Sequence, residues 1–217
     1  DFCLSRGLGD VYKRQVQLAR DPGALREQSR RTRDAELRLT AWHNRVWKPV
    51  IAAVNGTCAG GGLHFVADAD IVMAAADASF LDPHVSVGQV SAYETIGLLR
   101  KVPAEAVMRM ALVGRHERVS AARALELGMV SQVVDPPERL RDEAQALGEK
   151  VARNSPAAMA ATKRALWGAL EQGLTDACRA GAAEVVSMWG HPDQSEGPRA
   201  FAERREPVWQ PSPGGEG

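Results

Sequence analysis

The sequence predicts an α/β fold, and three observations lead to that prediction. Residues 49–54 form an unbroken apolar run, which is typical of a strand buried on both faces. A second apolar run, 71–75, follows a short helical pattern that begins at Leu63. The last third of the chain has helical periodicity only. The chain therefore combines a mixed strand and helix core, 16–135, with a helical region, 136–210.

Composition argues against several classes of protein. The 217 residues include 27 basic and 27 acidic side chains, and a net charge of zero is unlike a dedicated nucleic-acid binder. No apolar run in the sequence approaches the roughly 18 residues that span a bilayer. The three cysteines, Cys3, Cys58 and Cys178, are too scattered for a disulfide or zinc pattern. We therefore expect a reducing, cytoplasmic setting, without nucleic acid or membrane as a partner.

The amino-terminal part is the least patterned. Residues 1–15 lack periodicity, and we expect a non-native or disordered leader there. Residues 16–47 predict a helical region, in which Asp21 and Pro22 supply an N-cap and a first-turn proline. Five arginines of this region form either a solvated helix face or a contact for the phosphates of a large anionic ligand. They are Arg30, Arg31, Arg33, Arg38 and Arg45.

The stretch from 55 to 62 organises the core. It holds four glycines in eight residues, which indicates a tight turn and a close approach of the backbone. A strand precedes it and a helix start follows it, so backbone N–H groups should be presented at a positive helix end. This geometry suits a phosphate or an oxyanion. Residues 77–80 then predict a turn into another short strand, and 88–96 an irregular polar loop.

Capping residues divide the rest of the chain into helices. Residues 104–113 have an apolar face, and Ser120 caps a short helix that ends at Gly128. A strand is predicted at 129–134. The remaining predicted segments are helices at 138–153, 155–173, 175–189 and 196–205, and a disordered tail at 211–217.

Seven sequence motifs carry a further signal. They are KPVIAAVNG, AGGG, ADADIVMAA, ASF, ALVGRHERVSAARALELGMVSQVV, SPAAMAATKRAL and EGPRAFAERREPVW. Together they resemble the crotonase superfamily, which contains enoyl-CoA hydratases and isomerases, over residues 16–210. The resemblance implies a crotonase-like superhelix of stacked ββα turns. It also implies a C-terminal helical oligomerisation region that builds homotrimers or homohexamers.

The resemblance implies a chemistry as well. Family members act on acyl-CoA thioesters, with CoA as part of the substrate and not as a cofactor. Two backbone N–H groups stabilise the thioester oxyanion, and one such donor is worth about 3–4 kcal/mol. Gly61 matches one donor, with Ala59 and Gly60 beside it at the bound thioester. The alternative is a turn that needs glycine only for a positive φ. Phe201 and Arg204 match the segment that approaches the nucleotide end of CoA.

The chain departs from the family at its amino end. The family has further strands there, and a loop of the type Ala-Gly-x-Asp that carries the second oxyanion N–H. By spacing, that loop should end just before Val16. We therefore expect a truncated chain with an open sheet edge, which is poorly soluble or inactive on its own.

The two glutamates that hold and activate water in family hydratases are both replaced. His64 stands two residues after the triple glycine, and His84 follows Asp82 and Pro83. Free histidine titrates near about 6.5 and free glutamate near about 4.3, so neutral imidazole is the stronger base. A positive helix end at His64, and repulsion from a second nearby imidazolium, should favour neutral His64 as the base at pH 7. The pair would then activate a water between them; the alternative is a polar pocket that no longer catalyses.

The loop that contains Glu94 is the third departure. Glu94 is a candidate acid or nucleophile and Asp82 a weaker one, against the alternative that each is a charged loop residue. The other histidines, His43, His116 and His191, are predicted to lie at the surface. No metal site is expected, because the histidines lack ligand spacing with cysteines or carboxylates.

The sequence thus favours an enzyme that hydrates or isomerises enoyl-CoA. In this interpretation Gly61 polarises the thioester, while His64 and His84 handle water and protons. The alternative among enzymes is hydrolysis of a thioester or of a carbon–carbon bond, with His64 as base and Glu94 assisting. The alternative of a different class is a non-catalytic paralogue that binds CoA or builds oligomers.

Overall fold

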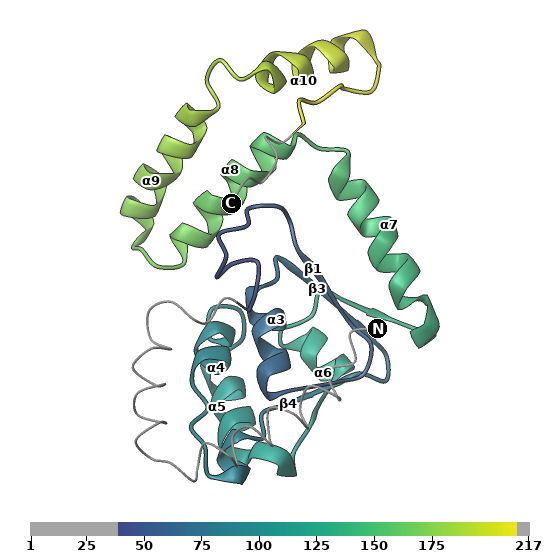
Figure 1. Ribbon diagram of the computed structural model, residues 1–217, viewed down its shortest axis with the longest axis vertical. Helices are drawn as coiled ribbons and strands as arrows, with labels where there is room; N and C mark the ends of the chain where they lie inside the picture. The colour runs from purple at the N-terminus through teal and green to yellow at the C-terminus, as the bar shows by residue number, and fades with distance from the viewer. Residues whose placement is uncertain (1–38, 212–217) are drawn as a thin grey trace. The chain divides into compact units, whose positions relative to one another are not determined.

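The computed structural model describes residues 39–211, which fall into two compact units. The first contains 39–45 and 51–141, and the second 46–50 and 142–211. Figure 1 labels the helices and strands of both units. Four expectations lie outside the described residues: the leader, the helix up to residue 38, the tail from 212 onward, and four of the clustered arginines, Arg30, Arg31, Arg33 and Arg38.

The first unit is built on two three-stranded sheets. One sheet is parallel, in the order β1-β3-β6; in the other, β2 is parallel to β4 and β5 is antiparallel. Successive strands therefore go to different sheets before the chain enters the next helix, which confirms the predicted stacked ββα arrangement. The strands are β1 (Ile51–Val54), β2 (Thr57–Ala59), β3 (Ile71–Ala75), β4 (Ser79–Leu81), β5 (Val119–Ser120) and β6 (Gln132–Val134).

The central strand β3 carries the core of the parallel sheet. Its residues Met73, Ala74 and Ala75 are buried, as expected for a strand with neighbours on both sides. The predicted strand at 129–134 is shorter in the structure, because the N–H groups of Met129 and Val130 bond to a carbonyl of the preceding helix. The stretch predicted as a turn contains the short strand β2.

Four α-helices belong to the described part of the first unit. Ser120 caps α6 as predicted, accepting the N–H of Arg123 at 3.2 Å, and Gly128 follows with φ of +75°. The predicted helix at 104–113 has those bounds in the structure. The helices are α3 (Leu63–Asp68), α4 (Tyr93–Leu98), α5 (Ala104–Val113) and α6 (Ala121–Glu126).

Helix α4 was predicted as an irregular loop, and the structure corrects this. Its buried residues are Glu94, Thr95 and Leu98, so its inner face is mostly polar and gives no apolar periodicity. Gly97 lets α4 pack closely on α3, since a Cβ at this glycine would lie 3.0 Å from the Cβ of Ala67. This close approach brings Glu94 to the interior of the unit.

Residues 40–45 form turns and not the end of the predicted helix. The Asn44 side-chain amide donates to the carbonyl of Thr40 at 2.8 Å, and Arg45 takes a left-handed φ of +54°. A left-handed residue cannot continue a right-handed helix. The Thr40 hydroxyl is directed to the carboxylate of Asp68, at 2.8 Å.

The second unit is helical, as predicted. Helices α8 and α9 pack side by side and are joined by a bidentate ion pair between Arg164 and Glu184, at 2.7–3.0 Å (Figure 1). Helix α10 begins earlier than predicted, because His191 caps it and Pro192 occupies its first turn. The helices are α7 (Leu140–Ala152), α8 (Pro156–Ala169), α9 (Leu174–Ser187) and α10 (Pro192–Glu203).

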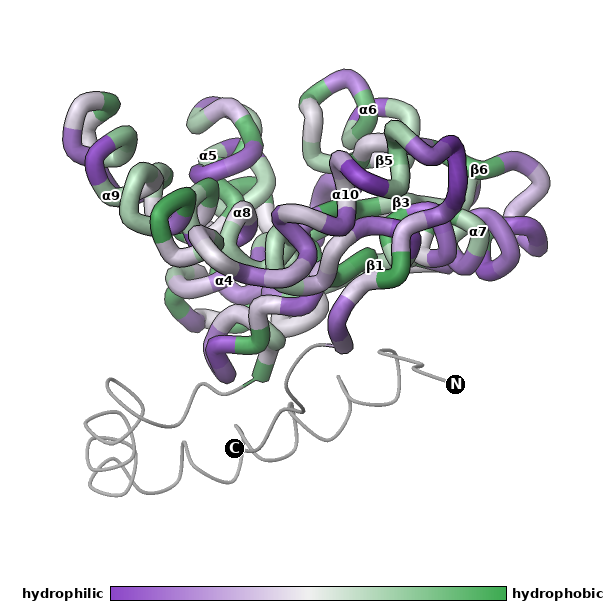
Figure 2. Tube along the Cα trace, turned by 90° about the horizontal axis from the view of Figure 1, so that it is seen from above, coloured by the Kyte–Doolittle hydropathy of each residue, from purple (hydrophilic) through white to green (hydrophobic). Residues whose placement is uncertain are grey.

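The helices of the second unit differ in the hydropathy of their exposed residues. The buried residue of α7 is Leu140, and Figure 2 shows many hydrophilic residues along the rest of this helix. By contrast, α9 and its C-terminal end expose Leu174, Val185 and Trp189. Among the helices of residues 39–211, none combines the length and the apolar character that crossing a bilayer requires.

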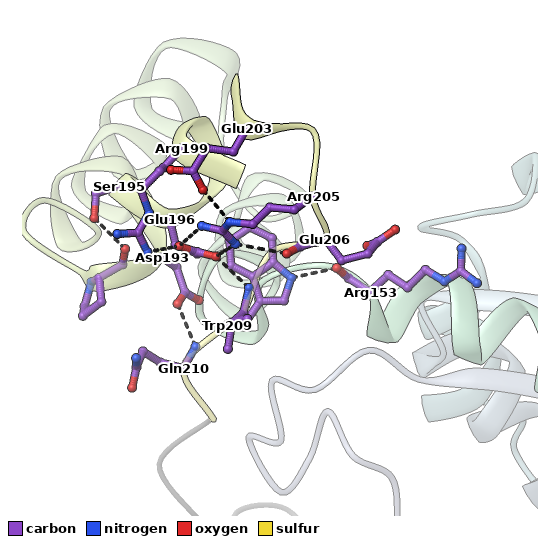
Figure 3. Close-up of polar contacts among 12 residues, drawn as sticks. Arg153, Asp193, Ser195, Glu196, Arg199, Glu203, Arg205, Glu206, Trp209 and Gln210 are labelled. Atoms are coloured by element: carbon purple, nitrogen blue, oxygen red, sulfur yellow. Dashed lines mark hydrogen bonds and ion pairs between the residues drawn. The ribbon is translucent and has the colours of Figure 1, made fainter. Parts of the chain in front are cut away.

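Glu196 of α10 holds the extended segment that follows this helix (Figure 3). Its carboxylate accepts hydrogen bonds from Arg205 at 2.6 Å, from the N–H of Val208 at 2.8 Å and from Arg199 at 2.5 Å. These bonds, that of Arg205 foremost, keep the pKa of Glu196 well below its ordinary value. Gln210 is held similarly, because its N–H donates to the buried carboxylate of Asp193 at 2.9 Å.

Gly97→Ala should lower the free energy of unfolding by about 1–3 kcal/mol, the usual cost of overpacking. The new Cβ would meet the Cβ of Ala67 at 3.0 Å, and helix α3 would have to move. Gly181→Ala in α9 is the control, because an added Cβ there meets nothing within 4 Å. That variant should be neutral or gain up to about 1 kcal/mol from helix propensity. Urea unfolding compares the two; a stabilised Gly97→Ala protein would contradict the close packing.

Candidate active site

The glycine turn leads from β2 into helix α3. Gly60–Gly62 form a short 3₁₀ helix, and Gly60 has φ of +52°, the left-handed conformation that favours glycine. Gly61 is exposed, and a Cβ there would meet nothing within 4 Å. The first N–H groups of a helix have no acceptor within that helix. The positive φ of Gly60 explains the glycine at that position. The open space at Gly61 leaves room for a ligand beside its backbone.

His84 packs against this turn. A Cβ built on Gly60 would lie 3.6 Å from Cε1 of His84 and 3.7 Å from Cδ of Pro83. His84 begins the 3₁₀ helix His84–Val87, directly after the loop that contains Asp82 and Pro83. The imidazole is half-buried, with 20% of its side chain exposed. Glycine at position 60 thus provides both the turn and the space beside the ring.

Asp82 anchors His84 from the other side. Its carboxylate, fully buried, lies 2.5 Å from Nδ1 of His84 and accepts the backbone N–H of the same residue at 3.0 Å. The hydroxyl of Ser91 donates to the second carboxylate oxygen. Burial raises the pKa of Asp82, but the hydrogen bonds from His84 and Ser91 together outweigh it and lower that pKa. Asp82 is therefore not an exposed charged residue of a loop, which was the alternative for this position.

Glu94 lies between the two histidines. Its Oε1 is 3.2 Å from Nδ1 of His84, and its Oε2 is 3.6 Å from Nε2 of His64. The side chain projects from α4 and is 4% exposed. A carboxylate therefore occupies the space between the imidazoles, where we expected a water.

The two imidazoles have opposite electrostatic surroundings. His64, in the first turn of α3, is buried. Burial foremost, with the nearby imidazoles of His43 and His84, lowers its pKa by more than Glu94 and Asp68 raise it. The hydrogen bond to Asp82 raises the pKa of His84, and Glu94 adds to this against the effect of burial. The expectation of a lowered pKa thus agrees for His64, with burial as the largest cause. The raised pKa of His84 follows from its contact with Asp82, which sequence spacing did not reveal.

His43 extends the buried group beyond His64, although it was predicted as a surface residue. Its Nδ1 lies 2.7 Å from the hydroxyl of Thr40 and 3.4 Å from a carboxylate oxygen of Asp68. Its ring meets that of His64 edge-on, with centroids 6.1 Å apart. The sequence held no direct signal for this contact, since His43 lies on a turn whose path was mispredicted.

The remaining predicted residues do not belong to the group of His64, His84, Asp82 and Glu94. His116 is exposed after α5, and His191 caps α10 in the second unit. Phe201 and Arg204 also belong to the second unit; Phe201 is 87% exposed, and Arg204 ends α10 with φ of +55°. Ala59 is buried at the end of β2, directly before the glycine turn.

Asp82, His84 and Glu94 are the described residues that come nearest to a metal-ligand group, with candidate atoms within 4.8 Å of one another. A zinc ion with bonds of about 2.0–2.2 Å holds its ligand atoms well apart. The separation of 2.5 Å between Nδ1 of His84 and Oδ1 of Asp82 is instead that of a hydrogen bond. Hydrogen bonding accounts for the spacing, and we assign no metal to these residues.

Comparison with known proteins identifies the family. The sequence profile of one family, Enoyl-CoA hydratase/isomerase, matches residues 21–212. The chain belongs to this family. It is 35% identical over 174 residues to a probable mitochondrial enoyl-CoA hydratase of Dictyostelium discoideum, covering 79% of this chain and 62% of the relative. It is 38% identical over 170 residues to a carnitinyl-CoA dehydratase of Salmonella paratyphi B, covering 75% and 63%.

A solved structure of this family supports the fold. The crystal structure of an enoyl-CoA hydratase/isomerase from Mycobacterium paratuberculosis matches with a TM-score of 0.73 at 41% identity, over 76% of this chain and 64% of that one. The predicted membership of the crotonase superfamily is therefore confirmed. The chain spans less than two thirds of the length of these relatives.

In this hydratase/isomerase family member, His84 should titrate above its ordinary value of 6.5, and His64 below it. The hydrogen bond to Asp82 favours the His84 imidazolium, whereas burial disfavours the His64 imidazolium. Histidine ¹H–¹⁵N NMR over a pH series measures both, with His64→Gln and His84→Gln for assignment. A higher value for His64 than for His84 would contradict the geometry.

Proposed function

We propose that this protein acts on an acyl-CoA thioester as an enoyl-CoA hydratase or isomerase. The observation that supports this most is the buried group of His64, Glu94 and His84 beside the glycine turn. By the sequence resemblance, the two histidines would stand where hydratases of the family have glutamates, and Glu94 would supply a carboxylate from α4. The N–H of Gly61 would stabilise the thioester oxyanion, a contribution of about 3–4 kcal/mol.

The opposite pKa shifts of the imidazoles assign an acid and a base. Two titratable groups whose surroundings push their pKa values apart can serve as base and acid at the same pH. His64, kept neutral by burial, is the base that takes a proton from water. His84, kept protonated by its carboxylate neighbours, is the acid. Glu94 contacts both rings and stabilises positive charge on whichever ring is protonated.

The reaction then follows from these positions. Water adds to Cβ of the enoyl thioester as His64 accepts its proton, and the electron pair moves to the thioester oxygen beside Gly61. The enolate collapses when His84 gives its proton to Cα. Proton exchange between the two rings and solvent restores the starting state. Isomerisation uses the same groups, with a proton removed from the substrate and returned at another carbon.

The sequence resemblance motivates two separate sets of contacts with CoA. Ala59 and Gly60 would contact the thioester, and Phe201 and Arg204 the nucleotide. A homotrimer or homohexamer is our proposal for the assembly, motivated by apolar side chains exposed on the second unit, such as Leu174 at 82%. Light scattering on the purified protein measures the assembly directly.

His64→Ala should lower kcat/KM with crotonyl-CoA about a hundredfold or more, because the base that activates water is lost. The assay uses the protein in the full length that its gene encodes, and follows enone absorbance together with free thiol. His116→Ala is the matched control, since His116 is exposed, and should stay within about twofold.

The two signals also separate the alternatives. Loss of enone without thiol supports hydration, and thiol release supports thioester hydrolysis with His64 as base. Binding of crotonyl-CoA with neither change would indicate a non-catalytic paralogue. Unchanged turnover in His64→Ala would contradict the site.

The pH dependence of kcat/KM should be bell-shaped around 6.5, the ordinary histidine value. Activity needs neutral His64, so it falls as pH drops through a pKa that lies below 6.5. Activity also needs protonated His84, so it falls as pH rises through a pKa that lies above 6.5. A rate that rises steadily to pH 9 would exclude His84 as the acid.

A further inference from the structure

We infer that Asp82 is a positioning residue, which orients His84 and keeps a proton on its Nδ1, so that Nε2 is the nitrogen that exchanges protons with the substrate. The inference rests on the proposed function, because it gives His84 the role of acid. Asp82 itself touches neither the glycine turn nor the reacting atoms in this account. It acts through the imidazole.

The carboxylate of Asp82 is fixed on both sides. It is fully buried, and His84 donates to one oxygen through its backbone N–H at 3.0 Å and its ring at 2.5 Å. Ser91 donates to the other oxygen and lies 3.0 Å from the hydroxyl of Thr95 on α4. A buried carboxylate held by three donors stays ionised and has little freedom to turn.

This arrangement distinguishes the two ring nitrogens of His84. Nδ1 faces the carboxylates of Asp82 and Glu94, at 2.5 and 3.2 Å, so it carries hydrogen in both the neutral and the charged ring. Nε2 is then the nitrogen whose protonation changes. Cε1, which lies between the two nitrogens, faces the turn at Gly60, so the ring as a whole lies beside this turn. The proton that His84 gives up therefore leaves from the edge of the ring that Asp82 does not hold.

The charged groups around His84 come from three elements. Asp82 faces it from the loop after β4 and Glu94 from α4, while His64 of α3 lies on the far side of Glu94. Glu94 is shared between both rings, whereas Asp82 contacts His84 alone among the described histidines. Asp82 is thus the carboxylate that favours the protonated form of His84 and does not contact His64.

A purely structural role would give a different result on substitution. Asp82 also fixes the loop through the N–H of His84 and the hydroxyl of Ser91. Asp82→Asn removes the charge and keeps one oxygen that can accept the N–H of His84. Its amide NH₂ then faces Ser91, whose hydroxyl can accept as well as donate. Loop stability should therefore survive this change, while the ring loses the carboxylate charge that favours its protonated form.

The test compares Asp82→Asn with Asp77→Asn, an exposed carboxylate in the turn before β4. Asp82→Asn should lower kcat with crotonyl-CoA about a hundredfold or more with KM nearly unchanged, as expected when the tautomer of a catalytic histidine is lost. Its His84 pKa, read by ¹⁵N NMR, should fall toward 6.5. The urea midpoint should change little. Asp77→Asn should match the parent in all three measurements.

Two outcomes would overturn the inference: an unchanged His84 pKa and tautomer in Asp82→Asn, or an unchanged kcat in that variant of an active parent. If the parent shows no turnover with any acyl-CoA thioester, the proposed function fails. The NMR comparison then still decides the role of Asp82. A shifted pKa and altered tautomer support positioning, and identical spectra of the His84 ring reject it.

Discussion

The first unit is organised around a buried carboxylate, that of Glu94, which requires positively charged or hydrogen-bonding partners. Glu94 is 4% exposed, and an ionised group in such a place is costly unless it is paired and hydrogen-bonded. Its partners are two imidazoles that come from different elements, His64 on α3 and His84 after β4. Gly97, one turn further along α4, lets this helix lie close to α3. The pairing therefore depends on helix packing as much as on charge.

The group is asymmetric, and this makes it suited to acid–base chemistry. His84 has a second carboxylate, Asp82, at 2.5 Å, which favours its charged form. His64 is more buried than His84, which favours its neutral form, and its outer neighbour is another imidazole, that of His43. Glu94 thus contacts both His84, whose pKa is raised, and His64, whose pKa is lowered.

Much of the fold was predictable from the sequence, because apolar runs, caps and glycine turns are local signals. The strands at 51–54 and 71–75 and the capped helix after Ser120 are examples. Helix α4 was not predictable in this way, since its buried side carries Glu94 and Thr95 and shows no apolar period. The positions of the two histidines could be found by motif, but their partners could not. Contacts between residues far apart in the sequence, as between His64 and Glu94, follow from packing.

The absent side chain at Gly97 gives the site a sequence signature. Glu94 and Gly97 are spaced as E-x-x-G, while the histidines stand in GGG-x-H and in D-P-H. The elements of this signature support one another, because a side chain in place of the glycine would push the two helices apart, and a carboxylate without the histidines would lack these two partners. Genomic searches for all three patterns in one chain, in the order GGG-x-H, D-P-H and E-x-x-G, would therefore collect homologues that share this arrangement. Homologues with glutamates at the histidine positions and no E-x-x-G would sort apart from them.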